Sequence, residues 1–109
     1  RSTQTPPDVV LITGASPGLG RGIALRLAQD GRSVMVNYAR NREAAEETLR
    51  QCESERTHPA QRFVAVKGDI GEREQRRALV EETLRCFGRI DALVNNAGIF
   101  IGGGVADLK

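Results

Sequence analysis

Four short apolar runs alternate with longer amphipathic segments along this chain. The runs are rich in Val, Ile, Leu and Ala, which is typical of strands buried in a sheet. In the segments between them apolar residues recur at helical spacing, and a glycine or a proline lies shortly after each segment. We therefore expect strands and helices to alternate at Val9–Thr13, Leu19–Asp30, Ser33–Asn37, Arg42–Glu55, Arg62–Val66, Glu72–Phe87 and Ile90–Val94.

This alternation determines the expected fold class. Strands separated by helices cannot form hairpins, so the pattern predicts an α/β fold in which a parallel sheet has right-handed crossovers and helices on both faces. Residues 1–8 are a polar lead-in, where Pro6 and Pro7 disfavour helix and strand alike. Residues 9–109 are expected to be the N-terminal portion of one domain, with a further helix beginning at about Val105.

Composition and charge exclude several classes of protein. With 109 residues, 39% of them hydrophobic and 28% charged, the chain has room for one domain and is neither disordered nor a membrane protein. No signal-peptide pattern opens it. The net charge is only +2, aromatic residues make up 4%, and the arginines lie among acids, as where Glu46 and Arg50 are spaced to pair. Nucleic acid is therefore not an expected partner.

Cysteine and histidine are scarce. Cys52 and Cys86 are too few for a disulfide scaffold, and with a single histidine, His58, no familiar zinc spacing can be built. Both cysteines lie within predicted helices as small apolar residues. We expect free thiols in a reducing compartment, hence a cytoplasmic protein without a metal site.

The segment between the first strand and the first helix is rich in glycine. Glycines at a strand end and a helix start expose backbone N–H donors without a Cβ in the way, and the helix dipole adds a favourable field, so the segment suits a phosphate group. The alternative is that these glycines merely form a tight turn. The spacing G-x-x-x-G-x-G is not that of a Walker loop, since no Gly-Lys-Ser/Thr follows. The residues concerned are Gly14, Ser16, Pro17, Gly18, Leu19 and Gly20.

Two motifs together identify a resemblance. The glycine segment that begins at Thr13, followed much later by Asn95-Asn96-Ala97-Gly98 with Asp69 between them, resembles the short-chain dehydrogenase/reductase family. It is most similar to the group of 3-oxoacyl carrier-protein reductases, and the likeness extends from Val9 to Gly98. The resemblance implies a Rossmann-type doubly wound sheet with strand order 3-2-1-4 in this chain. It also implies binding of NAD or NADP by a homodimer or homotetramer.

The resemblance also implies roles for individual residues. Gly14, Ser16, Gly18, Leu19 and Gly20 would hold the pyrophosphate and the adjacent ribose, with Pro17 in the same loop. Asp69 and the backbone of Ile70 would contact the adenine. The stretch Asn96, Ala97 and Gly98 would line the ribose region of the cofactor, whereas Asn95 would tie strands together.

Strand positions agree with these assignments. Asp69 and Asn96 each follow a predicted strand, and ligands of open α/β sheets bind at the carboxyl ends of strands. With the order 3-2-1-4, the glycine segment and Asn96 would lie on the two sides of one crevice. Two alternatives stay open: Asp69 as part of a helix N-cap, and Asn95–Gly98 as an ordinary turn.

The end of the second strand bears on the choice of dinucleotide. Residues Asn37–Arg42 contain no carboxylate, which NAD-binding proteins usually carry there, but two arginines. A guanidinium matches a 2′-phosphate bidentately, so NADP is favoured over NAD, with Arg40 the better candidate and Tyr38 on the same adenosine side. Two points oppose this. Pro17 stands where many NADPH-using relatives have a basic residue, and both arginines can be solvated charges at a helix start.

The catalytic residues of the family are missing. The family uses a serine and a Tyr-x-x-x-Lys pair, in which the lysine lowers the pKa of the tyrosine for proton exchange with the substrate oxygen. The single tyrosine, Tyr38, is followed at that spacing by Arg42, and neither it nor Ser16 is assigned catalysis. The fourth strand would also be left as an exposed apolar edge. We therefore expect the N-terminal part of a larger protein, inactive by itself. The alternative is a gene product that is naturally this short.

Two functions remain open from the sequence. The first is an NADPH-dependent oxidoreductase that converts a small-molecule ketone into an alcohol, or the reverse, with catalytic residues beyond this chain. The second is a non-catalytic dinucleotide-binding module or cofactor sensor. A methyltransferase of related fold is a more distant third, because it would require an acid at the end of the second strand, where Asn37 and Tyr38 lie.

Overall fold

The structure is a computed structural model that describes residues 6–14 and 18–96. Strands and helices alternate throughout the described residues, as the hydrophobic pattern predicts. The elements are β1 (Val9–Thr13), α1 (Leu19–Gln29), β2 (Ser33–Tyr38), α2 (Arg42–Ser54), β3 (Phe63–Lys67), α3 (Arg73–Phe87) and β4 (Ala92–Asn95). The helix expected from Val105 lies outside the described residues.

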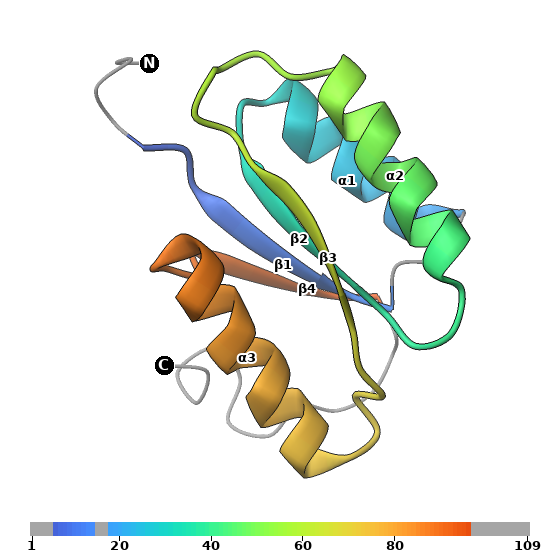
Figure 1. Cartoon of the computed structure of the whole chain (residues 1–109). Coiled ribbons are helices and arrows are strands. Elements are labelled where there is room, and N and C mark those ends of the chain that lie inside the picture. Colours follow the sequence, from blue (N-terminus) through green and yellow to red (C-terminus); the bar gives the residue numbers. More distant parts are fainter. Residues whose placement is uncertain (1–5, 15–17, 97–109) are drawn as a thin grey trace.

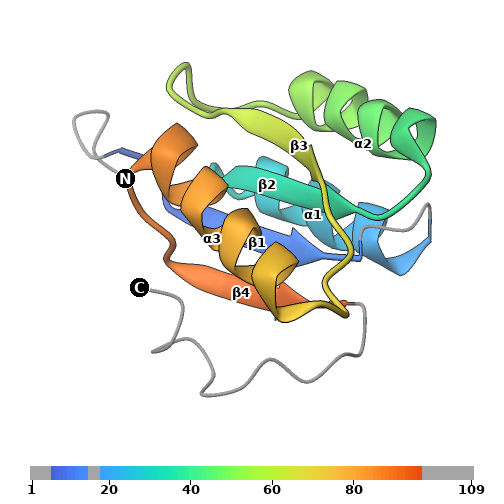
Figure 2. The same cartoon turned by 60° about the horizontal axis from the view of Figure 1, so that its bottom comes forward.

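The four strands form one parallel sheet in the order β3-β2-β1-β4. Helices α1 and α2 lie side by side on one face of the sheet, and α3 covers the other face (Figures 1 and 2). The crossover from β3 to β4 contains α3 and brings β4 beside β1. The expected α/β, Rossmann-type doubly wound arrangement is therefore confirmed, and every strand has its carboxyl end at the same edge of the sheet.

The core is divided by the sheet into two layers. Side chains of β1 alternate between them, so Val10 and Ile12 pack toward α1 and α2 while Leu11 packs toward α3. The central strands β1 and β2 are buried, apart from half-buried Tyr38, whereas the apolar residues of β3 and β4 are mostly half-buried because each strand has one neighbour. The edge position expected for β4 is thus observed among the described residues.

Small residues let α1 lie close to the sheet. Gly20, Ala24 and Ala28 form its buried face, one helical turn apart, while Ile23 and Leu27 are half-buried beside them. The helix ends as its sequence predicts, because Gly31 adopts a φ of +85° that favours glycine. Gly88 does the same after α3, with a φ of +79°, and its N–H donates to the Leu84 carbonyl.

Two strand starts differ from the sequence expectation. β3 begins at Phe63 rather than Arg62, since the Arg62 N–H donates to the Ser33 hydroxyl instead of a ladder carbonyl. β4 begins at Ala92 rather than Ile90. The Asp91 N–H donates to the Val9 carbonyl. The Val9 N–H donates to the Asp91 carboxylate at 2.7 Å, so a side-chain oxygen takes the place of a backbone carbonyl of the ladder.

The prediction that Glu46 pairs with Arg50 is wrong. Glu46 accepts from Arg42 one turn earlier, with 3.0 Å between Arg42 Nε and the carboxylate. Arg50 instead pairs with Glu47. Both geometries fit an exposed helix face, so spacing along the chain did not distinguish them.

A buried amide joins two connections at the end of the sheet opposite the strand carboxyl ends. The side chain of Gln61 is 1% exposed and precedes β3. Its Nε2 donates to the carbonyls of Ala28 and Arg32, at 3.0 and 2.8 Å. Its Oε1 accepts the N–H groups of Thr57 and His58, at 2.7 and 2.8 Å. The α1–β2 turn is thereby fixed to the α2–β3 connection.

Both cysteines are free thiols, as expected. Cys52 lies on the buried face of α2. Burial together with the charges of Glu53 and Glu55 raises its pKa to about 11. Cys86 is half-buried on α3, and its pKa is also raised, mainly by burial. Neither is therefore a reactive thiolate at neutral pH. Within residues 6–14 and 18–96 no helix has the length and apolar character needed to cross a membrane.

Candidate functional site

A chain of hydrogen bonds crosses the carboxyl ends of all four strands. The N–H of Gly14, which follows β1, donates to Asn37 Oδ1 of β2 at 3.2 Å. Asn37 Nδ2 in turn donates to the carbonyl of Gly68, which follows β3, at 3.1 Å. On the other side, Asn96 Nδ2 donates to the Gly14 carbonyl at 2.8 Å. The loops expected to bind a cofactor are therefore fixed to one another.

Asn37 is the central residue of this chain, and sequence reasoning gave it no role beyond the absence of an acid. It is 1% exposed, and its amide also lies 3.5 Å from the Val66 carbonyl. A carboxylate at this position could accept from Gly14 but could not donate to Gly68. The available signal was a polar residue between the apolar residues Val36 and Tyr38, since a buried amide requires partners.

We predict that Asn37→Ala destabilises the protein and loosens both loops. The substitution leaves the Gly14 N–H and the Gly68 carbonyl without their partner, which should cost about 2 kcal/mol. Urea denaturation of the full-length protein measures this loss. Gln29→Ala is the control, because it removes an exposed amide that bonds Glu55 at the surface. Equal stabilities of Asn37→Ala and the unmodified protein would contradict the role of this amide.

The residues after β4 lie against the residues after β1. The Thr13 hydroxyl donates to Asn95 Oδ1 at 3.1 Å, so Asn95 ties β4 to β1. Asn96 reaches Gly14 itself. The φ of Gly14 is +64°, which favours glycine, so the start of the glycine segment has a backbone reason for its residue type. The structure thus places Asn96 beside the glycine segment, as the strand order predicts.

The N-terminus of α1 has no side-chain cap among the described residues, and its first turn contains no acid. By contrast, α2 is capped by Asn41, whose Oδ1 accepts the Ala44 N–H at 3.0 Å, and Glu43 lies in its first turn. Gly18 occupies the N-cap position of α1 and is exposed; a Cβ added there would have no heavy atom of residues 6–14 and 18–96 within 4 Å. Packing therefore does not require glycine at this position, and the helix end suits an anion.

The turn after β2 carries the two candidate arginines. Arg42 pairs with Glu46, whereas Arg40 is exposed and forms no ion pair with any described residue. Tyr38 is half-buried against the α1–α2 layer of the core, and its carbonyl accepts the Gly68 N–H at 2.9 Å. Of the two arginines, only Arg40 has no ion pair with a described residue at this edge of the sheet.

Asp69 follows β3 at the same edge. It is exposed, and its Oδ1 accepts the Gly71 N–H at 2.9 Å. The N-cap position of α3 belongs to Glu72, so Asp69 shapes the turn before the helix. The Ile70 side chain is 5% exposed and packs with Leu79, which leaves only its backbone available to a ligand. Ser16, Pro17, Ala97 and Gly98 lie outside the described residues.

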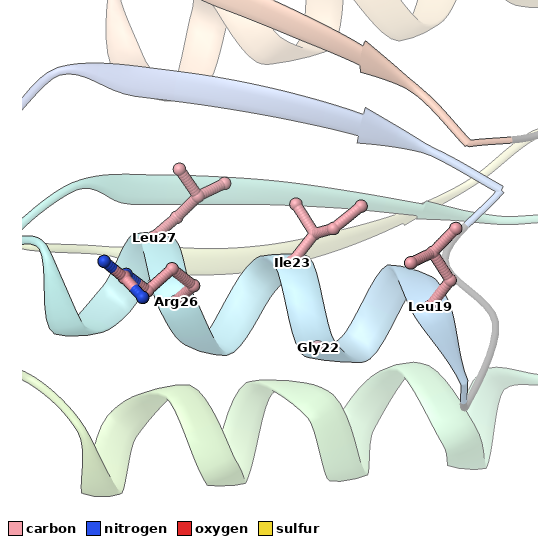
Figure 3. A pocket seen from close by; sticks show the side chains of 5 residues that line it. All are labelled: Leu19, Gly22, Ile23, Arg26 and Leu27. Carbon is pink, nitrogen blue, oxygen red and sulfur yellow. The ribbon is translucent and has the colours of Figure 1, made fainter.

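A pocket extends along α1 away from the strand edge, beginning at Leu19. Leu19, Ile23 and Leu27 project from one side of the helix, away from α2, and Gly22 and Arg26 complete the lining (Figure 3). Leu19 is 70% exposed. Arg26 is the only titratable residue in the lining, so this apolar surface offers no chemistry, and the candidate site remains the strand edge.

The sequence profile described as "short chain dehydrogenase" matches residues 8–109. The chain belongs to the short-chain dehydrogenase family. Members of this family are oxidoreductases that use NAD or NADP, which agrees with the parallel sheet and the glycine segment described above. The family expected from the sequence motifs is therefore confirmed, and this chain corresponds to the N-terminal region of its members.

Individual family members resemble this chain over most of its length. Versicolorin reductase 1 of Aspergillus parasiticus is 40% identical over 100 residues, covering 92% of this chain and 37% of that protein. The 3-oxoacyl-[acyl-carrier-protein] reductase of Staphylococcus aureus (strain Mu50) is 39% identical over 89 residues, or 82% of this chain and 35% of that protein. A solved short-chain dehydrogenase/reductase of Serratia marcescens superposes with a TM-score of 0.75 and 31% identity, over 93% of this chain and 40% of that one. The chain thus spans little more than a third of these relatives.

Proposed function

We propose that the protein containing this chain is an oxidoreductase that uses NADPH to reduce a small-molecule ketone to an alcohol, or catalyses the reverse oxidation. The two curated relatives described above are reductases by name, which supports this class. The preference for NADPH rests on Arg40, whose exposed guanidinium forms no ion pair with any described residue. By its resemblance to the family, the protein would work as a homodimer or homotetramer, and its free cysteines fit the cytoplasm.

The donors at the strand edge fit a dinucleotide. An uncapped helix end and the open space at Gly18 suit a pyrophosphate, and an unpaired guanidinium suits a 2′-phosphate. Beside these groups, the exposed Asp69 and the backbone of Ile70 would receive the adenine. The full set proposed to hold the cofactor is Gly14, Ser16, Pro17, Gly18, Leu19, Gly20, Tyr38, Arg40, Asp69, Ile70, Asn96, Ala97 and Gly98.

Residues of this chain bind and orient the cofactor rather than move protons. Bound NADPH supplies a hydride to the carbonyl carbon. Asn37 accepts from Gly14 and donates to Gly68, which holds the two adenosine-side loops, and Asn96 holds Gly14 from the other side. No Tyr-x-x-x-Lys is present in residues 1–109, so the proton donor is proposed to lie beyond them.

We predict that Arg40→Ala in the full-length protein weakens NADPH binding about tenfold to 150-fold, the range expected for one charge-assisted hydrogen bond. Only NADPH presents a 2′-phosphate, so the affinity for NADH should stay nearly constant. The loss should shrink at high salt because a partly exposed ion pair is screened. Titration calorimetry with each dinucleotide measures both affinities.

Arg42→Ala is the matched control, because Arg42 already pairs with Glu46. If NADPH and NADH weaken equally in Arg40→Ala, that residue supports the turn rather than the phosphate. If only Arg42→Ala affects NADPH, the neighbouring arginine binds the phosphate. A preference of the unmodified protein for NADH would overturn the assignment of the second-strand end.

The second candidate is a dinucleotide-binding module without catalysis. Residues 1–109 carry the proposed dinucleotide site without the Tyr-x-x-x-Lys pair, so they fit either candidate. The two functions differ in turnover: a module binds NADPH but does not oxidise it in the presence of ketones. Serine and Tyr-x-x-x-Lys in the rest of the reading frame, together with consumption of NADPH, would exclude the module.

A further inference from the structure

A polar contact joins the first turns of the two helices that bound the candidate cofactor site. Arg21, which directly follows the glycine segment, extends from α1 to α2. Its Nε donates to the Thr48 hydroxyl at 2.9 Å, and its Nη2 donates to the Ala44 carbonyl at 2.9 Å. The Thr48 hydroxyl also donates to that carbonyl at 3.1 Å. We call Arg21, Ala44 and Thr48 the interhelical brace.

The hydrogen bonds of the interhelical brace are partly buried, unlike those of a surface contact. Thr48 is 1% exposed, and its hydroxyl both donates and accepts. The guanidinium of Arg21 uses two N–H groups on two acceptors, a fork geometry that a lysine cannot reproduce. Helices α1 and α2 lie side by side on the same face of the sheet (Figure 1), so the brace fixes one helix relative to the other.

The turn that carries Arg40 is bonded to the same end of α2. Asn41 accepts the Ala44 N–H through its side chain and the Ala45 N–H through its carbonyl. The Arg40 carbonyl accepts the Arg42 N–H at 3.1 Å. If the start of α2 moves, the turn that carries Arg40 must therefore move with it. The interhelical brace holds the start of α2 against α1.

We propose that Arg21 is a positioning residue for dinucleotide choice: through Thr48 and Ala44 it sets the separation between Gly18 at the start of α1 and Arg40 before α2. This inference rests on the proposed NADPH function. A pyrophosphate held at the start of α1 and a 2′-phosphate held by Arg40 belong to one ligand, and the few covalent bonds between them limit the distance that the two contacts can span. A shift of α2 relative to α1 would therefore disturb the second contact while sparing the first.

Thr48→Val tests this role without changing any charge. The side chain keeps nearly the same volume but loses the hydroxyl that accepts from Arg21. We expect the Kd for NADPH to rise about fivefold to tenfold, part of the loss expected for Arg40→Ala, and the Kd for NADH to change less than about twofold. Thr48→Ser keeps the hydroxyl and should retain the ratio of the two Kd values. Titration calorimetry of the full-length protein gives these ratios.

Two further variants separate positioning from long-range attraction. Arg21→Lys keeps the positive charge but loses the fork, so it should lower the preference for NADPH as Thr48→Val does. Arg26→Gln, on the same helix, removes a guanidinium that is 76% exposed and pairs with Asp30, and it should leave the ratio unchanged. Retention of the full preference by Arg21→Lys and Thr48→Val would overturn the inference.

The combination with Arg40→Ala completes the test. In that background Thr48→Val should not change the ratio of the two Kd values further, because the guanidinium that the brace positions is gone. An equal loss of both affinities in Thr48→Val would show a structural role only and would overturn the inference. If Arg40→Ala changes the ratio but Thr48→Val does not, the inference fails while the proposed function stands. Failure of the unmodified protein to bind either dinucleotide would overturn both.

Discussion

Gly18→Val in the full-length protein should weaken NADPH and NADH alike, by at least about 100-fold, as expected if two charge-assisted hydrogen bonds to the pyrophosphate are lost. The added side chain would occupy the exposed space in front of the uncapped end of α1, where the pyrophosphate is proposed to bind. Both dinucleotides carry this group, so the ratio of their affinities should not change. Titration calorimetry with each cofactor measures the effect.

This substitution should cost only about 1 kcal/mol of stability, because valine is a poorer N-cap residue than glycine. The added side chain has room, since a Cβ at Gly18 would have no heavy atom of the described residues within 4 Å. Gly22→Val is the matched control: Gly22 lies one turn further along α1 and also faces open space. It should leave both affinities unchanged. Normal cofactor binding by Gly18→Val would remove the start of α1 from the proposed site.

Gln61→Ala should lower the free energy of unfolding by roughly 4 kcal/mol. The side chain satisfies four backbone groups, the carbonyls of Ala28 and Arg32 and the N–H groups of Thr57 and His58. Its removal leaves these groups without a partner at a site where the side chain was 1% exposed. Urea denaturation of the full-length protein gives the free energy of unfolding.

Two variants separate the hydrogen bonds of Gln61 from its volume. Gln61→Met keeps a side chain of similar length without donors or acceptors of comparable strength, and it should be almost as destabilising as Gln61→Ala. Gln51→Ala removes an amide that bonds only Glu47 on the surface of α2, and it should cost far less. A Gln61→Met protein as stable as the unmodified one would show that the amide contributes nothing beyond filling space.

The elements and their order were predictable because their signals are local. Each apolar run and each helical stripe is contained in one segment, and the glycines that end α1 and α3 act through their own φ values. The parallel arrangement then follows from the lengths of the connections. Exact strand starts were less predictable, since β3 and β4 begin where the backbone N–H groups of Arg62 and Val9 bond side chains rather than carbonyls.

Part of the candidate site was also predictable from sequence. Asp69 and Asn96 follow strands, and parallel strands end at one edge, so their common location requires only the strand order. The contact between Asn96 and Gly14 agrees with that reasoning. Pairing on α2 was not predictable, because Glu46 has an arginine one turn before it and another one turn after it.

The sequence by itself therefore determined the family, the strand order and which loops meet. Only the tertiary structure decided what the buried polar side chains do. Asn37 forms hydrogen bonds with residues 23 and 31 positions away along the chain. For Gln61 two of the separations are 29 and 33 positions, and for Arg21 they are 23 and 27. A polar side chain in a buried position must find hydrogen-bond partners, but the partners come from whichever strands and turns the sheet brings alongside, and no local pattern carries that information.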